Sequence, residues 1–252
     1  MRKHLYFYGK MRYDTAIMKG WCDMYDIVLL DADMTIWDFE ASERFALQDV
    51  VDRLQVTMTA EIAAYYHKIN SALWHAFDLK QITREELTVR RFRELMEYVG
   101  RPNAEDPAEL NAYYQERLGS YSIMLPGAEE MCRHLAQHCT LYILTNGLHV
   151  AQVGRFEKSP IRHYIKEMFI SQDMGCQKPD WEYFDKVFAM IGLEDKRRAV
   201  MVGDSLTSDI QGGINAGVDT IWYNPKGKPH NPNIMPTYTA ATMDEIAAYV
   251  LN

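Results

Sequence analysis

The sequence predicts an α/β protein: a three-layer α/β/α core around a parallel sheet, with an all-helical domain inserted after the first strand. Short branched apolar runs alternate with helix-like segments from about residue 126 onward, which is typical of a parallel sheet covered on both faces. Residues from roughly 40 to 120 show helical periodicity alone. A buried-strand pattern at residues 27–30 precedes this block, so the block interrupts the sheet.

Length and charge narrow the class of function. The chain has 252 residues, 48% of them hydrophobic and 25% charged, ordinary values for a globular protein that can bury a full core. Its formal net charge of -8 argues against a nucleic-acid polymer as partner, because no basic excess exists to release counterions. A small phosphate ester stays compatible, since a bound cation can reverse the local field.

The cysteines and the apolar runs of the sequence indicate where in the cell the protein is expected to work. No cysteine forms a CxxC pair, so reduced and mostly buried thiols are expected rather than a disulfide framework or a zinc site. No apolar run approaches membrane-spanning length, and residues 1–23 lack the apolar core of a signal peptide. We therefore expect a cytoplasmic protein without a membrane partner, monomeric or dimeric, with a poorly ordered N-terminal extension over residues 1–23. The cysteines are Cys22, Cys132, Cys139 and Cys176.

The first strand is expected over residues 27–30, and a helical domain over residues 41–120 follows it. Ser42 and Thr59 are placed to cap its first two helices. Thr83 and Glu86 fit a capping box before the third helix. A fourth helix is expected from about Pro107 to about Leu118. The catalytic core then consists of residues 24–40 and 121–252.

Strands and helices alternate through the rest of the core. The expected strands cover residues 140–144, 168–170, 199–202 and 220–223. The expected helices cover residues 128–138, 181–191, 210–216 and 244–251, with a further helix between the strands at 140–144 and 168–170. Residues 224–237 hold four of the nine prolines and are expected to form an ordered surface loop.

Polar side chains follow the first strand at alternate positions. Asp31, Asp33 and Thr35 can share one side of the extended chain, just past the strand's carboxyl end. Open α/β sheets bind their ligands at that edge. Two crowded acids repel each other unless a cation or a proton relieves them, so the position predicts a metal site and acid–base chemistry.

Two later strands end in similar signatures, and a lysine lies between them in sequence. Each alone has an ordinary explanation: a turn, a helix cap or a solvated lysine. In a parallel sheet, however, all of them converge on one edge. A phosphate monoester needs such a set, because its charge must be neutralised, its phosphorus attacked and its leaving oxygen protonated. The signatures are Thr145-Asn146-Gly147, Lys178-Pro179, and Gly203-Asp204-Ser205 with Asp209.

Together these segments resemble the four motifs of the haloacid dehalogenase (HAD) superfamily, in order and from about residue 25 onward. The resemblance implies a Rossmann-like core with a C1-type cap. It also implies that Asp31 is the nucleophile, and that Asp33 protonates the leaving group and then activates water. Asp31, the backbone carbonyl of Asp33, and Asp204 resemble the ligands of Mg²⁺. Dehalogenases of the superfamily lack an acid at the place of Asp33, so its presence favours phosphoryl transfer.

The remaining motif residues resemble the groups that hold phosphate. Thr145 and the backbone amide of Asn146 resemble phosphate ligands, and Lys178 resembles the lysine that pairs with nucleophile and phosphate. Asp209 resembles an acid that either binds metal water or orients Lys178. The supporting residues are Asp209, Thr35 and Ser205.

The segment from Gly203 to Thr220 is similar to the house-cleaning pyrimidine 5′-nucleotidases of the superfamily. This resemblance implies Mg²⁺-dependent hydrolysis of a nucleoside 5′-monophosphate. Three alternatives stay open: a phosphatase of another small metabolite, of the sugar phosphate or phosphoglycolate type; a phosphomutase; and a non-catalytic binding protein on the same scaffold. Release of free phosphate separates a phosphatase from a mutase.

Specificity is expected to lie in the cap and in the loop after the first strand. Trp37 and Phe39 follow the catalytic turn directly and are candidates for facing substrate. Most other aromatic residues of the block recur at helical spacing and are expected to be core. The basic cluster of Arg90, Arg91 and Arg93 could meet a ligand, but a solvated helix face is the expectation. His149 is expected to lie on the surface. The other aromatic and histidine candidates are Tyr65, Tyr66, Trp74, His75 and Phe77.

Overall fold

The computed structural model describes residues 25–252, so the expected extension over residues 1–23 and Cys22 lie outside it. The described strands form one parallel sheet of six strands in the order β3-β2-β1-β4-β5-β6. β1 therefore lies in the middle, between the two strands that carry the other polar signatures. The strands are β1 (Ile27–Leu30), β2 (Thr140–Thr145), β3 (Ile165–Ile170), β4 (Ala199–Gly203), β5 (Asp219–Tyr223) and β6 (Tyr238–Ala240).

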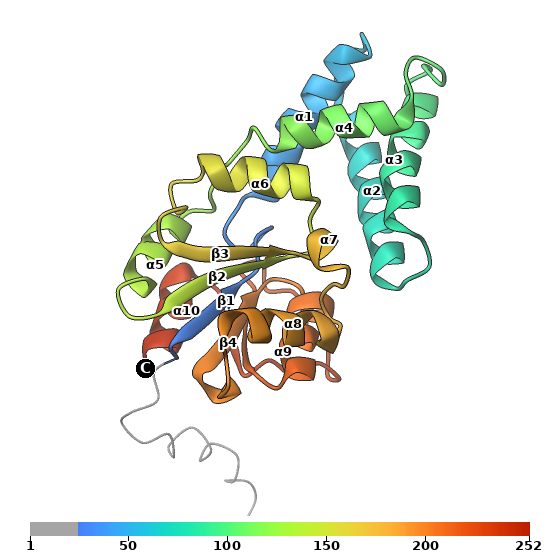
Figure 1. Ribbon diagram of the computed structural model, residues 1–252. Helices are drawn as coiled ribbons and strands as arrows, with labels where there is room; N and C mark the ends of the chain where they lie inside the picture. The colour runs from blue at the N-terminus through green and yellow to red at the C-terminus, as the bar shows by residue number, and fades with distance from the viewer. Residues whose placement is uncertain (1–24) are drawn as a thin grey trace, which may run out of the picture.

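Helices cover both faces of this sheet, as the alternating sequence pattern predicts (Figure 1). Val28 and Leu30 of β1 point into a core shared with α5 (Ala128–Leu135) and α10 (Met243–Leu251). Leu29, between them, points to the other face, where α8 (Trp181–Ile191) packs. This alternation along one fully buried strand gives the three-layer α/β/α arrangement. The remaining core helices are α6 (His149–Lys158), α7 (Ser171–Met174), α9 (Gln211–Ala216) and the short turns η1 (Lys196–Arg198) and η2 (Leu206–Ile210).

Five helices lie between β1 and β2, and the first four of them project beyond the sheet (Figure 1). They share a hydrophobic cluster of their own, with Tyr66, Phe92 and Tyr114 at its centre. Helix α4 also packs against α6 of the core, and a Cβ on Gly154 would lie 2.8 Å from the carbonyl oxygen of Gly119. The division of the chain into domains at residues 40 and 120 stays a prediction. The helices are α1 (Phe39–Arg53), α2 (Ala60–Asp78), α3 (Arg84–Tyr98) and α4 (Pro107–Leu118).

Local capping signals predict some helix starts correctly and one wrongly. Thr59 caps α2, and Thr83 with Glu86 forms the expected capping box of α3. Ser42 does not cap α1. The cap is Asp38, four residues before Ser42, whose side chain accepts a hydrogen bond from the amide of Ala41. The Ser42 side chain is instead buried inside α1 and donates to the carbonyl oxygens of Asp38 and Tyr121.

The edge of the sheet contains a strand that sequence reasoning missed. β6 is only three residues long and follows the proline-rich loop. It is specified by long-range pairing with β5, and Thr237 and Thr220 bond to each other's backbone amides beside it. Such a short segment carries no periodicity that a sequence could reveal.

The described cysteines Cys132, Cys139 and Cys176 are free thiols, and Cys132 and Cys139 are buried. Within residues 25–252 no helix has the length and apolar character needed to cross a bilayer.

Replacing Met201 with alanine should lower the free energy of unfolding by about 2–5 kcal/mol, because this fully buried β4 side chain would leave a cavity. Urea unfolding measures the change. Met190→Ala is the matched control: its side chain is 59% exposed, and the expected change is within about 0.5 kcal/mol. Equal losses in the two variants would contradict the assignment of Met201 to the core.

Candidate active site

A cavity of about 300 Å³ lies between the carboxyl edge of the sheet and the helical block. Its floor comes from the ends of β1, β2 and β4, and its walls come from α1–α4 and α6. The volume is at the small end of the range that ligand pockets occupy, which suits a small molecule rather than a polymer. The floor residues include Asp31, Asp33, Thr145, Asn146, Lys178, Asp204, Ser205 and Asp209.

Lys178 is the buried centre of the floor. Its ammonium group donates to Asp31 Oδ1 at 2.6 Å, to Asp209 Oδ1 at 2.8 Å and to the carbonyl oxygen of Leu144 at 2.6 Å. These contacts use all three donors of an ammonium group. Burial lowers the pKa of Lys178, but the carboxylates of Asp209 and Asp31 outweigh it and raise the pKa above its usual value. The lysine therefore stays charged and fixes both acids.

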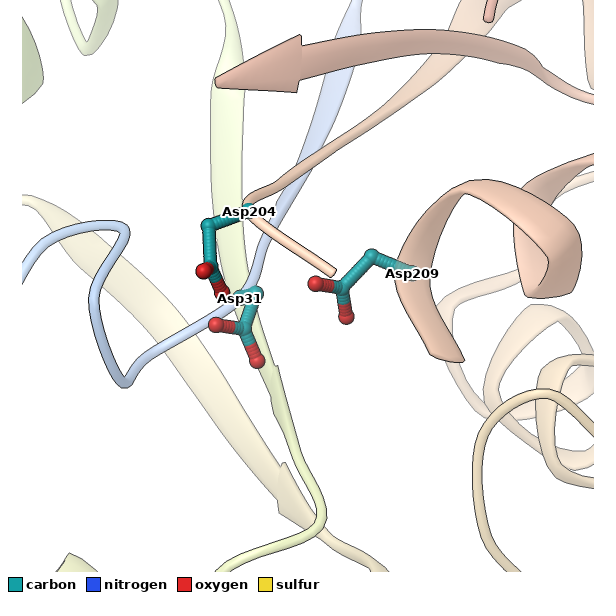
Figure 2. A group of neighbouring side chains, drawn as sticks. All are labelled: Asp31, Asp204 and Asp209. Carbon is teal, nitrogen blue, oxygen red and sulfur yellow. The ribbon is translucent and has the colours of Figure 1, made fainter. Parts of the chain in front are cut away.

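Three carboxylates, from Asp31, Asp204 and Asp209, gather beside this lysine with ligand atoms within 4.8 Å of one another. Figure 2 shows Asp31 and Asp204 next to each other at the strand ends, with the carboxyl group of Asp209 directed toward them. Gly203 makes the approach possible, since a Cβ there would lie 2.3 Å from the Asp209 carboxyl group. The amide of Ser205 donates to Asp209 Oδ2 at 3.0 Å.

The acid cluster carries more negative charge than its neighbours neutralise. Burial, followed by the charge of Asp209, raises the pKa of Asp31 well above its usual value and raises the pKa of Asp204 to about 6. Lys228 offsets part of this through a 3.0 Å contact with Asp204 Oδ2. A site built from several carboxylate oxygens with surplus negative charge has the donor chemistry that Mg²⁺ prefers.

The loops at the ends of β2 and before α8 are tied together. The side chain of Asn146 donates to the carbonyl oxygen of Lys178 at 2.9 Å and accepts from the amide of Lys178 at 3.0 Å. Thr145 is buried, and its hydroxyl accepts from the amide of Gly147 at 3.0 Å. The Asn146 side chain is thus structural, which leaves its backbone amide as the group predicted to hold phosphate.

Thr35 and Ser205 support the site from outside the acid cluster. Thr35 is fully buried, and its hydroxyl donates to Asp31 Oδ2 at 3.1 Å, so it orients the carboxylate opposite Lys178. Ser205 lines the cavity, and its side chain caps the turn that carries Asp209.

Asp33 lines the cavity but lies apart from the acid cluster. Its Oδ1 accepts from Arg155 at 2.6 Å, and its Oδ2 accepts from Gln152 at 2.8 Å. Sequence reasoning missed both donors. They sit on α6, more than a hundred residues along the chain, and their spacing of three residues carries no motif that could have identified them.

Of the two predicted specificity residues, Trp37 needs correction. Trp37 is fully buried and does not line the cavity; its indole N–H donates to Ser159 Oγ at 3.3 Å, and its backbone forms bridges to Asp33 and Met124. It therefore belongs to the core. Phe39, in contrast, does line the cavity.

The expectation that Arg91 lies on a solvated helix face is also wrong. Only 2% of Arg91 is exposed, and its guanidinium group donates to the side-chain oxygens of Asn70 on α2 and Asn111 on α4. These partners come from neighbouring helices, which a single sequence does not reveal. The expectation for His149 is confirmed, since it is exposed and pairs with Asp173 at 2.8 Å.

The helical block supplies further wall residues. Trp74 lines the cavity, whereas Tyr66 and Phe77 are buried in hydrophobic clusters, as expected from their spacing. Asp78, at the end of α2, was not predicted. Burial raises its pKa to about 6, and the charge of Asp209 adds to the rise.

A parallel sheet with a buried Asp–Lys–Asp cluster at its carboxyl edge, facing a helical block across a cavity, defines an α/β enzyme that binds its ligand at that edge. The sequence model described as haloacid dehalogenase-like hydrolase matches residues 25–217. The chain belongs to this family, and it is a phosphatase of the family.

Its similarity to known proteins extends over nearly the whole chain. It is 36% identical over 223 residues to pyrimidine 5′-nucleotidase PynA of Streptococcus pneumoniae, covering 88% of this chain and 93% of that protein. It is 33% identical over 222 residues to pyrimidine 5′-nucleotidase YjjG of Escherichia coli, covering 88% and 96%. The crystal structure of the HAD-hydrolase YfnB from Bacillus subtilis, bound to magnesium, superposes with a TM-score of 0.85 at 37% identity, covering 90% and 99%.

The raised pKa of Asp78 makes stability depend on pH. The native state keeps this proton up to about pH 6, whereas an unfolded aspartate loses it near pH 3.9. Raising the pH through this window therefore costs native stability. Asp78→Asn removes this cost. The unfolding free energy of the variant minus that of the unmodified protein should therefore be about 1 kcal/mol larger at pH 7 than at pH 4, a figure already reduced for the partial exposure of Asp78.

Urea unfolding at the two pH values in EDTA measures this difference. Asp185→Asn, at an exposed position on α8, is the control for the loss of a carboxyl group. A pH-independent effect of Asp78→Asn would show that its carboxyl group is solvated.

Proposed function

We propose that the protein is a Mg²⁺-dependent phosphatase that hydrolyses a pyrimidine nucleoside 5′-monophosphate through an aspartyl-phosphate intermediate. The observation that carries this proposal is the position of Asp31. Its carboxylate is oriented by Lys178 at 2.6 Å and Thr35 at 3.1 Å, and it lines a small cavity together with Asp33. Attack and proton transfer can therefore both occur at one bound ester.

In the proposed reaction a carboxylate oxygen of Asp31 bonds to phosphorus while the bond from phosphorus to the ester oxygen breaks. Asp33 gives its proton to the departing oxygen, and the alcohol leaves. Asp33 then takes a proton from water, which attacks phosphorus and releases phosphate, and Asp31 returns as carboxylate. Thr145 and the amide of Asn146 are the proposed donors to the phosphoryl oxygens. Lys178, whose three donors are already bonded, contributes its positive charge beside them.

The ligands proposed for Mg²⁺ are Asp31, the backbone carbonyl of Asp33, and Asp204, with Asp209 beside them. When bound, the cation neutralises charge on the nucleophile and on the phosphate and so lets two anions meet. The three-acid cluster and its raised pKa values support this assignment. The relative YfnB supports it as well, since its crystal structure holds magnesium.

The cavity walls and the relatives favour a nucleotide. Phe39 and Trp74 both line the cavity, and a base can stack on an aromatic side chain. PynA and YjjG are named pyrimidine 5′-nucleotidases. The small cavity also fits the proposal that the partner is a small phosphate ester. We further propose that the enzyme works in the cytoplasm, where such free metabolites occur.

Purified protein with Mg²⁺ should release free phosphate from UMP and dUMP within a broad panel of monoesters, and excess EDTA should abolish the release until Mg²⁺ is restored. A phosphate-release assay follows both. Asp31→Asn should lose at least about 10³-fold in kcat while keeping its fold by circular dichroism, because the nucleophile is gone. Full activity of Asp31→Asn would rule out the covalent route.

Trp74→Ala should lower kcat/KM for UMP about tenfold, because a stacking contact is worth on the order of 1–3 kcal/mol per base. The value for glycerol 3-phosphate, which has no ring, should change little. Steady-state kinetics on both esters measures the contrast. Trp181→Ala, whose indole is 65% exposed on α8, is the control. An equal loss on both esters would place Trp74 in the structure of the cavity rather than in recognition of a base.

A further inference from the structure

The carboxyl group of Asp33 is fixed at both oxygens by α6. Arg155 Nη1 donates to Oδ1 at 2.6 Å, and Gln152 Nε2 donates to Oδ2 at 2.8 Å. An ionised carboxylate offers about four lone-pair sites, so each oxygen keeps one that can face the cavity and carry the proton that Asp33 transfers. Two donors from one helix therefore set the plane of this carboxyl group and leave an acceptor site free on each of its oxygens.

Arg155 is a buried residue whose hydrogen bond to Asp33 is formed inside the protein. Its side chain is fully buried, with the guanidinium carbon 4.9 Å from the ring centre of Trp37 and 5.9 Å from that of Phe39. Within the described residues its Nε and Nη2 atoms have no hydrogen-bond partner. Burying a charge that is only partly satisfied is costly, so a contact selected for stability alone would be expected to satisfy more of it.

Gln152 reaches Asp33 through a space that a glycine keeps open. A Cβ on Gly147 would lie 1.9 Å from Gln152 Nε2, so any other residue there would push the amide away from Asp33. Gly147 follows Thr145 and Asn146 directly. The loop proposed to hold phosphate thus also clears the path for the group that fixes Asp33.

Resting on the proposed function, we propose that Arg155 and Gln152 are positioning residues that hold the carboxyl group of Asp33 in line with the leaving oxygen of the ester. Their contacts are to the side-chain oxygens of Asp33, not to its backbone carbonyl, the atom proposed to bind Mg²⁺. They act through Asp33, and their contribution is confined to the step in which the alcohol departs with a proton. The rival explanation is that the pair only anchors α6 to the loop after β1.

The two explanations predict different losses in kcat/KM for esters with different leaving groups. p-Nitrophenolate departs without a proton, whereas the primary alkoxide of UMP needs one. In a reaction through an aspartyl phosphate, kcat/KM includes only the steps up to departure of the alcohol. A loss of anchoring lowers kcat/KM for both esters by the same factor, whereas a displaced Asp33 lowers it more for UMP than for p-nitrophenyl phosphate.

The experiment measures kcat/KM of Arg155→Met and Gln152→Leu with p-nitrophenyl phosphate and with the alkyl phosphate that the unmodified enzyme cleaves fastest, which we expect to be UMP. For Arg155→Met we expect a loss of about 10²-fold on the alkyl ester and less than about tenfold on the aryl ester. Gln152→Leu should show the same contrast at smaller size, and Arg155→Lys should recover part of it.

Gln152→Leu removes no charge, so it carries the test even where Arg155→Met does not fold. Arg162→Met and Gln137→Leu, both at exposed positions, are the matched controls and should leave both esters unchanged. Equal losses on the two esters in Arg155→Met and Gln152→Leu would overturn the proposal and leave the phosphatase intact. Absence of phosphate release by the unmodified protein from every ester would instead overturn the proposed function itself.

Discussion

The buried Lys178 ammonium, held between Asp31 and Asp209, is the contact on which the rest of the site depends. A buried cation must be paired, and a buried carboxylate must be paired as well. One lysine therefore draws together the loop before α8, the end of β1 and the turn after β4, while its third donor fixes the end of β2. The β3-to-β5 part of the sheet is the frame that brings these ends to one edge.

This contact leaves a charge imbalance that gives the site its chemistry. Lys178 satisfies two acids, but Asp204 adds a third, and its pKa rises to about 6 in partial burial. The imbalance supports the proposed Mg²⁺ site, and the cavity beside it has room for the proposed anionic ester. Two contacts join the segment between α2 and α3 to the core: Lys80 pairs with Asp180, and Arg84 donates to Ser171.

Sequence reasoning succeeded where a structure is specified by neighbours in the chain. The caps at Thr59 and Thr83, the branched run of β1 and the acids that follow it are all local signals. It failed where a local signal had a competitor, as when Asp38 rather than Ser42 capped α1. It also failed for β6, which is too short to have a period and exists because β5 offers it an edge.

The sequence by itself determined the layer order of the core and the convergence of the motif residues, because strand periodicity and a parallel sheet leave few other arrangements. Only the tertiary structure decided how individual side chains are used. Arg155 meets Asp33 across 122 residues of chain, Trp37 turns into the core instead of the cavity, and Arg91 is buried between α2 and α4. Backbone form follows from short-range sterics, whereas a side chain's partner depends on which distant surface packs against it.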